Sequence, residues 1–311
     1  MSHESKQGSE EYGATGREGA VAERLTAYGG RAGDAIVYSS AHLAVVATVE
    51  VAVVMLLLSL PASPAPLVVG LATFAVYAHD RVADADTDAA SDPERSAFVR
   101  RHGSALYVAG SAAYGLAVAL SALGGPAAVA VTLLPGAVWI AYARDAVAGF
   151  GARVRRLKEV AVVNSAVVAL AWATTLTALP VAFADVAVTP ATAVVFGYLL
   201  LRSFVDAEIP NVDDVAADRA DGVTTLPVAL GVPATRRALY GVDLLTAGFV
   251  AWAVAASHLS VGVAAALGVG VCYSVCVVAL LGRADADLVS LASEGEYLVV
   301  AAALVCTLTL A

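Results

Sequence analysis

The sequence predicts an all-α membrane protein, and three observations indicate this fold class. Of its 311 residues, 59% are hydrophobic and 14% charged, whereas soluble domains carry roughly 25% charged residues. Apolar runs of about 20 residues recur, the length that a helix needs to cross about 30 Å of hydrocarbon. The alternating pattern of a barrel strand is absent, and a bilayer offers the backbone no water, so each run is expected to be helical.

Nine membrane-spanning helices are expected, and the connections between them indicate their orientation. The expected spans are 36–60, 65–84, 104–123, 126–143, 160–179, 190–207, 238–257, 260–281 and 296–311. The connections after the first, third, fifth and seventh spans read PASPAP, ALGGP, PVAFADVAVTP and SHLS, without Lys or Arg. All 18 basic residues lie in the N-terminal tail or on the other side. By the positive-inside rule that side is cytoplasmic, which predicts a multi-pass plasma-membrane protein with an internal N-terminus.

The rest of the composition limits the other possibilities. Residues 1–34 are polar and lack a signal-peptide pattern, so a disordered cytoplasmic tail is expected before one domain over 35–311. The net charge of −9 and the excess of Arg over Lys are typical of a halophilic proteome and do not indicate nucleic-acid binding. Cys272, Cys276 and Cys306 lie in apolar spans and are interpreted as packing residues.

Carboxylates gather directly after the second expected span. The apolar stretch APLVVGLATFAVYA is followed by HDRVADADTD, residues 79–88. Asp80, Asp84 and Asp88 are four residues apart, so a continuing helix would place them on one face. Like charges at this spacing repel one another, whereas a divalent cation bound between them would make the interaction attractive. Oxygen ligands favour Mg²⁺, although a solvated acidic helix end is the simpler alternative.

A second acidic cluster on the same side of the membrane strengthens the metal-site interpretation. Asp214 and Asp218 follow the sixth span with the same spacing, and a weak internal duplication would bring the two clusters face to face. Between them lies a basic loop with Arg144 and Lys158. Facing carboxylates and bases suit a pyrophosphate bridged by Mg²⁺ ions, because carboxylates cannot hold such an anion directly.

These residues resemble the UbiA superfamily of intramembrane prenyltransferases. The stretch DVAADRADGVTTLP is similar to the second family signature, and the matching residues are Asp214, Asp218, Arg219, Gly222, Thr225, Leu226 and Pro227. Lys158 and Asn164 match the start of the family's fifth helix. Asp84 and Asp88 match the end of the first signature, whereas Asp80 and Arg81 stand where the family has an Asn-Asp pair. The resemblance covers nearly everything from about residue 35 onward.

The resemblance implies nine helices around a central cavity, in which a prenyl group passes from an allylic pyrophosphate to a lipophilic acceptor. The Mg²⁺ ligands it implies are Asp80, Asp84, Asp88, Asp214 and Asp218. Lys158, Arg81, Arg144 and Arg219 would neutralise the pyrophosphate, and Tyr77 and Tyr142 would face the allylic cation. Asn164 would contact substrate. Glu50, a carboxyl within the first span, would stay protonated or face the cavity and contact the acceptor. Membrane lipids are the only further partners expected.

Two other classes of function compete with this interpretation. A cation transporter, or a protein that only binds an isoprenoid lipid, could use the same acidic cavity. Transporters place acids and broken helices near the bilayer midplane, whereas the acids here cluster at helix ends. An alcohol phosphatidyltransferase needs Asp-Gly followed by Ala-Arg, and DGVTTL at 221–226 does not supply that motif.

Overall fold

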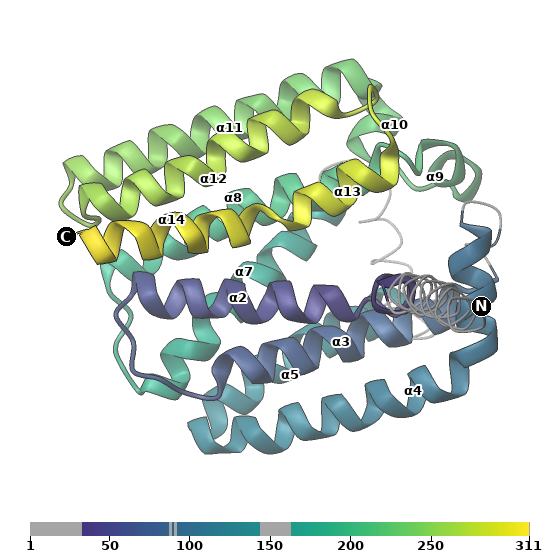
Figure 1. Cartoon of the computed structure of the whole chain (residues 1–311), viewed down its shortest axis with the longest axis horizontal. Helices are drawn as coiled ribbons and strands as arrows, with labels where there is room; N and C mark the ends of the chain where they lie inside the picture. Colours follow the sequence, from purple (N-terminus) through teal and green to yellow (C-terminus); the bar gives the residue numbers. More distant parts are fainter. Residues whose placement is uncertain (1–32, 87–88, 90–91, 144–162, 311) are drawn as a thin grey trace, which may run out of the picture.

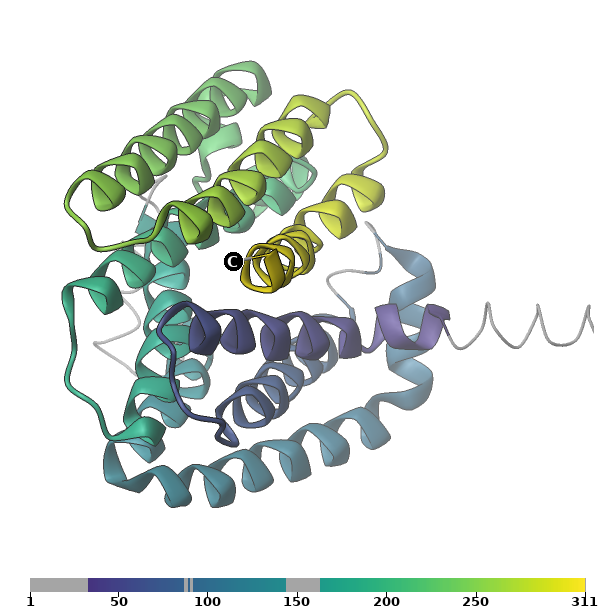
Figure 2. The same ribbon diagram turned by 60° about the vertical axis from the view of Figure 1, so that its left-hand side comes forward.

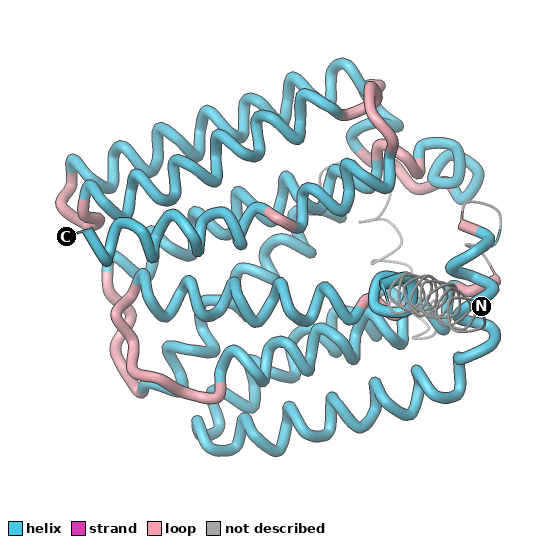
Figure 3. Tube along the Cα trace, viewed as in Figure 1, coloured by secondary structure: helices cyan, strands magenta, loops and turns pink. Residues whose placement is uncertain are grey.

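A computed structural model of the chain describes residues 33–86, 89, 92–143 and 163–310, and the regular structure in these ranges is helical (Figure 3). The long helices are α2 (Ala41–Leu57), α3 (Ala65–Asp84), α4 (Pro93–Ser121), α5 (Gly125–Ala143), α7 (Val163–Ala184), α8 (Pro190–Asn211), α11 (Val232–Ala255), α12 (Val261–Leu280) and α14 (Glu296–Leu310). The short ones are η2 (Ala122–Gly124), α9 (Val215–Asp221), α10 (Leu226–Leu230) and α13 (Ala286–Glu294). The predicted all-α class is confirmed.

Capping residues in the sequence set where helices begin. Asp92 accepts a hydrogen bond from the backbone N–H of Arg95 at 2.9 Å, and proline follows at the first helical position of α4. Thr189 and Thr192 form a reciprocal capping box at the start of α8. These caps satisfy amide groups that have no partner within the helix.

The long helices lie side by side and reverse direction at short connections (Figure 1). Helices that follow one another in the chain pack together, as α2 does with α3, α3 with α4, α7 with α8 and α11 with α12. The connections 58–64, 185–189 and 256–260 lie at one end. The ends of α3 and α8 lie at the opposite end, together with α9, α10 and α13. We call this second end the acidic end, because both aspartate motifs follow helices that finish there.

The first and last long helices of the chain close the bundle. α14 lies beside α2 in both ribbon views (Figures 1 and 2), and the two helices are in contact. α14 also packs along α12. The N-terminal half of the chain is therefore joined to the C-terminal half along this α2–α14 contact.

Several helices are apolar enough to cross a membrane. Within the described residues, five helical segments qualify by length and composition, namely 93–140, 165–184, 232–255, 261–280 and 288–307. The first of these contains both α4 and α5. Of the remaining long helices, α2 has 17 residues, whereas α3 and α8 carry charged residues near one end. The chain is a helical protein with several membrane-spanning segments.

The contact between α12 and α14 leaves no room for a side chain at one position. A Cβ atom at Gly270 would lie 2.5 Å from a methyl group of Val300 and 2.7 Å from the hydroxyl oxygen of Tyr198. A Cβ atom at Gly268, half a turn away on the same helix, would meet nothing within 4 Å. The two glycines therefore form a matched pair for testing the packing.

We predict that Gly270→Ala lowers the free energy of unfolding by about 1–3 kcal/mol, because the methyl group overpacks the interface. Gly268→Ala should leave stability unchanged or raise it by up to about 1 kcal/mol through helix propensity. Thermal unfolding of both variants in detergent measures the difference. Equal midpoints for the two variants would show that α12 and α14 do not meet as described.

Candidate functional site

A cavity of about 510 Å³ lies between helices from both halves of the chain. Side chains of α2, α3, α7, α8, α13 and α14 line it. Four residues singled out from the sequence are among them: Glu50, Tyr77, Arg81 and Asp214. We call this space the polar cavity. It brings together residues of the first and second expected spans with a residue that follows the sixth.

The polar cavity is charged where it reaches the acidic end of the bundle. Arg81, in the last turn of α3, donates a hydrogen bond from Nε to the hydroxyl of Ser40 at 3.2 Å. Arg95 also lines the cavity, and its Nε lies 3.3 Å from a carboxylate oxygen of Asp92. Asp214, the residue directly before α9, lines the same space. Two arginines, Arg81 and Arg95, and the carboxylate of Asp214 thus line the polar cavity together.

The other predicted aspartates in the described residues have separate surroundings. Asp80 accepts a hydrogen bond from the indole N–H of Trp139 on α5 at 3.0 Å. Asp84 is exposed as the last residue of α3. Asp218 accepts a hydrogen bond from the hydroxyl of Thr225 at 2.9 Å. In the described part of the chain, no three His, Cys, Asp or Glu side chains are grouped as a metal ion would require.

The structure describes some of the remaining predicted residues fully, others only as part of a helix, and three of them not at all. Arg219 is exposed on α9. Tyr142 lies on α5 and Asn164 on α7, but neither side chain is described. The predicted residues outside the described ranges are Asp88, Arg144 and Lys158.

The inner part of the polar cavity contains Glu50 and two polar groups that the sequence analysis did not single out. Glu50 is 5% exposed and accepts a hydrogen bond from the indole N–H of Trp172 at 3.3 Å. Asp206 on α8 and Tyr297 on α14 line the same space. Asp206 could have been found in the sequence, because an ionisable residue inside an apolar segment usually faces a cavity or a partner.

A buried ion-pair network stands next to this inner part. Arg202 on α8 is fully buried, and its Nη1 and Nη2 lie 2.5 Å from Asp243 on α11 and 2.6 Å from Glu296 on α14. Ser274 on α12 donates a further hydrogen bond to Asp243 at 2.9 Å. The network therefore ties four helices together. The sequence did not predict it, since its members are widely separated along the chain.

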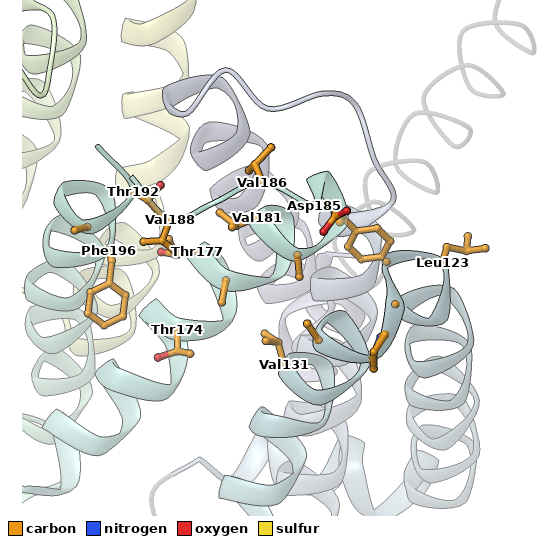
Figure 4. A pocket seen from close by; sticks show the side chains of 18 residues that line it. Leu123, Val131, Thr174, Thr177, Val181, Asp185, Val186, Val188, Thr192 and Phe196 are labelled. Carbon is orange, nitrogen blue, oxygen red and sulfur yellow. The ribbon is translucent and has the colours of Figure 1, made fainter. Parts of the chain in front are cut away.

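A larger hollow, seen from close by in Figure 4, lies around connections at the end opposite the aspartate motifs. It has a volume of about 950 Å³ and is lined mainly by aliphatic, threonine and phenylalanine side chains around the connections between α4 and α5 and between α7 and α8. Asp185 is the only ionisable group among the described residues that line it. We take the polar cavity as the candidate site, because binding and catalysis need convergent polar groups as well as volume.

The fold and the charged cavity define a class: polytopic helical membrane proteins with polar groups enclosed between their helices. Within that class, the path of the chain is similar to that of one solved membrane protein. A digeranylgeranylglyceryl phosphate synthase, whose solved structure comes from a study of its mechanism in membranes, matches with a TM-score of 0.52. The match covers 90% of this chain and 94% of that chain at 12% sequence identity.

The likeness agrees with the predicted all-α membrane fold and with the resemblance noted in the sequence motifs. At 12% identity, the likeness concerns the path of the chain, and it assigns no residue a role. No protein-family model and no curated protein matches the sequence. The function must therefore be argued from the residues of this chain.

We predict that Arg202→Met lowers the free energy of unfolding by about 3–5 kcal/mol, because Asp243 and Glu296 lose their buried cation. Thermal unfolding in detergent measures the loss, and Arg283→Met, at an exposed arginine after α12, is the control. Replacing Arg202, Asp243 and Glu296 together by apolar residues should restore much of the stability. An Arg202→Met variant as stable as the control would contradict a structural role for the network.

Proposed function

We propose that the protein is a Mg²⁺-dependent intramembrane prenyltransferase, which transfers an isoprenyl group from an allylic prenyl pyrophosphate to a lipophilic acceptor. One observation carries the proposal. The two aspartate-bearing helix ends, α3 and the segment after α8, contribute Arg81 and Asp214 to the same cavity. The fold supports the proposal, because the matching structure is a synthase of digeranylgeranylglyceryl phosphate.

The donor set suits a hard divalent cation. Asp213 and Asp214 both line the polar cavity, Asp84 ends α3, and Asp218 follows on α9. Carboxylate oxygens are the ligands that Mg²⁺ prefers. Under this proposal Asp84, Asp88, Asp214 and Asp218 hold the metal, which would supply positive charge to the departing pyrophosphate. Asp80 belongs to the same proposed set, and its bond to Trp139 would orient it.

The cationic and aromatic residues have complementary roles in this proposal. Arg81, Arg144, Lys158 and Arg219 neutralise the phosphate oxygens that carry the charge developing in the transition state. Tyr77 lines the polar cavity, and Tyr142 lies near the end of α5. Their ring faces would attract the allylic cation, an interaction worth up to about 2 kcal/mol when water is excluded. Asn164 would orient the donor.

The proposed setting is the cell membrane, with nine spans and a cytoplasmic acidic end. The lack of Lys and Arg in the connections at the other end supports this orientation. A geranylgeranyl-type pyrophosphate is the donor to test first, and a glycerophosphate lipid is the first acceptor, because the matching structure is named for such a compound. Quinone precursors, carotenoid end groups and tetrapyrroles are the further candidates.

We predict that Asp84→Ala and Asp218→Ala each reduce prenyl transfer by roughly 10²-fold or more, because charge stabilisation of the leaving group is lost. The assay follows consumption of geranylgeranyl pyrophosphate by the purified chain with Mg²⁺ and extracted lipids. Asp86→Ala is the matched control, since Asp86 is exposed just beyond α3 and its nearest ion pair, with Arg100, is 3.8 Å long. Unchanged turnover in both Asp84→Ala and Asp218→Ala would refute the assignment.

A cation transporter is the second candidate, and the buried acids favour it. Glu50 and Asp206 face a cavity inside the bundle, where transporters hold their coupling ions. The two functions differ in whether the binding of the cation depends on pyrophosphate.

We predict that Mg²⁺ and inorganic pyrophosphate each tighten the binding of the other in calorimetric titrations, because a metal held by the carboxylates would supply positive charge to the anion. A transporter would bind its cation with the same affinity whether pyrophosphate is present or absent. Asp214→Ala should abolish the mutual tightening, while Asp185→Asn, at the opposite end of the bundle, should retain it. Independent binding of the two ligands would favour transport over transfer.

A further inference from the structure

The larger hollow, at the end of the bundle opposite the aspartate motifs, contains a buried hydroxyl group without a partner. Thr177 on α7 lines this hollow and is 4% exposed. Its Oγ1 has no hydrogen-bond partner among the described residues. A buried polar atom in this state is costly, and such atoms are rare in native proteins. The hydroxyl of Thr177 therefore indicates a polar atom that a ligand supplies.

Neighbouring threonines show that the unpaired hydroxyl belongs to this position and is not a general property of threonine in these helices. Thr174 and Thr175, on the same helix, donate to backbone carbonyl oxygens one turn earlier at 2.6 and 2.9 Å. Thr192 on α8 also lines the hollow (Figure 4), and its hydroxyl belongs to the capping box of that helix. Such local bonds are usual for threonine. Of these four threonines, Thr177 alone leaves its hydroxyl to the hollow.

The rest of the lining disfavours a charged ligand. Most lining side chains are aliphatic, and Asp185 is the only ionisable group among the described residues that line the hollow. None of these described residues can therefore neutralise a phosphate, and an unpaired charge in apolar surroundings is expensive. Asp185 is itself exposed, so it offers a buried ammonium group no desolvated partner. The lining thus favours a neutral ligand with a large apolar part.

The size of the hollow fits a small lipid better than water. Its volume of about 950 Å³ lies within the roughly 300–1,000 Å³ of small-molecule sites, which combine mainly apolar walls with a few polar groups. A buried water molecule makes about three hydrogen bonds to polar groups of the protein. The hydroxyl of Thr177 supplies only one such group, so an ordered water does not account for the hollow.

We propose that the larger hollow binds a neutral lipid alcohol, whose hydroxyl group forms a hydrogen bond with Thr177 and whose hydrocarbon part fills the apolar space. The two hydroxyl groups match because each can both donate and accept a hydrogen bond. A pure hydrocarbon would leave Thr177 without a partner. The hollow and the aspartate motifs lie at opposite ends of the bundle, so the inference does not depend on the prenyltransferase function proposed above.

The test uses the full chain in detergent with hexadecanol as the probe. Unfolding midpoints over a range of probe concentrations give relative affinities, and a diazirine-bearing hexadecanol marks the contacted residues for mass spectrometry. We expect hexadecanol to bind about tenfold more tightly than hexadecane or hexadecyl phosphate. The photolabel should fall on α5, α7 or α8 at the end where the hollow lies. Thr177→Val should remove the preference for the alcohol over hexadecane, whereas Thr177→Ser should retain it.

Further variants separate ligand binding from stability. Thr175→Val removes a buried hydroxyl that is already bonded within α7 and is not part of the lining, so the preference for hexadecanol should persist. Ala178→Phe places a ring in the hollow and should abolish the binding of all the probes. Without probe, Thr177→Val should unfold at the same temperature as the unmodified protein or higher, because no hydrogen bond is lost.

Equal affinity for hexadecanol and hexadecane in the unmodified protein would overturn the inference and show that lipid chains of any kind fill the hollow. An undiminished preference for the alcohol in Thr177→Val, or unchanged binding in Ala178→Phe, would also overturn it. So would photolabelling confined to the acidic end of the bundle. A lower unfolding temperature of Thr177→Val without probe would show that this hydroxyl is bonded within the fold, which contradicts its assignment to a ligand.

Discussion

A charge buried between membrane helices must be paired, and the ion pairs of Arg202 hold the helices of the C-terminal half of the chain together. Its guanidinium joins α8 to α11 through Asp243 and to α14 through Glu296. Because α14 in turn packs on α2, the network sets the wall of the polar cavity on which Asp206 and Tyr297 lie. The cost of removing three charges from water is offset only while all of them remain together.

The direction of the helices is the second constraint. The described short connections reverse the chain, and the long helices α3 and α8 finish at the same end (Figure 1). Their polar continuations can then share a cavity although α4, α5 and α7 lie between them in the sequence. The larger hollow at the opposite end has a mainly apolar lining, in which Asp185 is the only ionisable group among the described residues, whereas several charged side chains line the polar cavity.

Local signals in the sequence predicted the helices well. The span expected at 65–84 corresponds to α3 (Ala65–Asp84), because its hydropathy changes sharply at both ends. The span expected from 104 belongs to a helix that begins at Pro93, eleven residues earlier. Hydropathy could not reveal this start, since the first turns of α4 are polar. The cap by Asp92 was the available signal.

Long-range contacts could not be predicted in the same way. Spacing placed Asp80 on one face with Asp84, but no periodicity could show that Trp139, on another helix, donates to Asp80. Likewise, Arg202 and its two carboxylates come from three helices, and without the fold each is only an isolated charge in an apolar segment. Such residues are expensive in a membrane, and that cost is the signal that would have directed attention to them.

The central claim is that the ends of α3 and α8 meet around one metal-bridged pyrophosphate, and distances from a paramagnetic metal test it most directly. Nitroxide labels would be placed singly at Ala83 on α3 and at Ala216 on α9, both exposed, after replacement of Cys272, Cys276 and Cys306 by serine. With Mn²⁺ in place of Mg²⁺ and pyrophosphate added, the account predicts short metal-to-label distances at both positions. A Mn²⁺ ion close to only one label would contradict it.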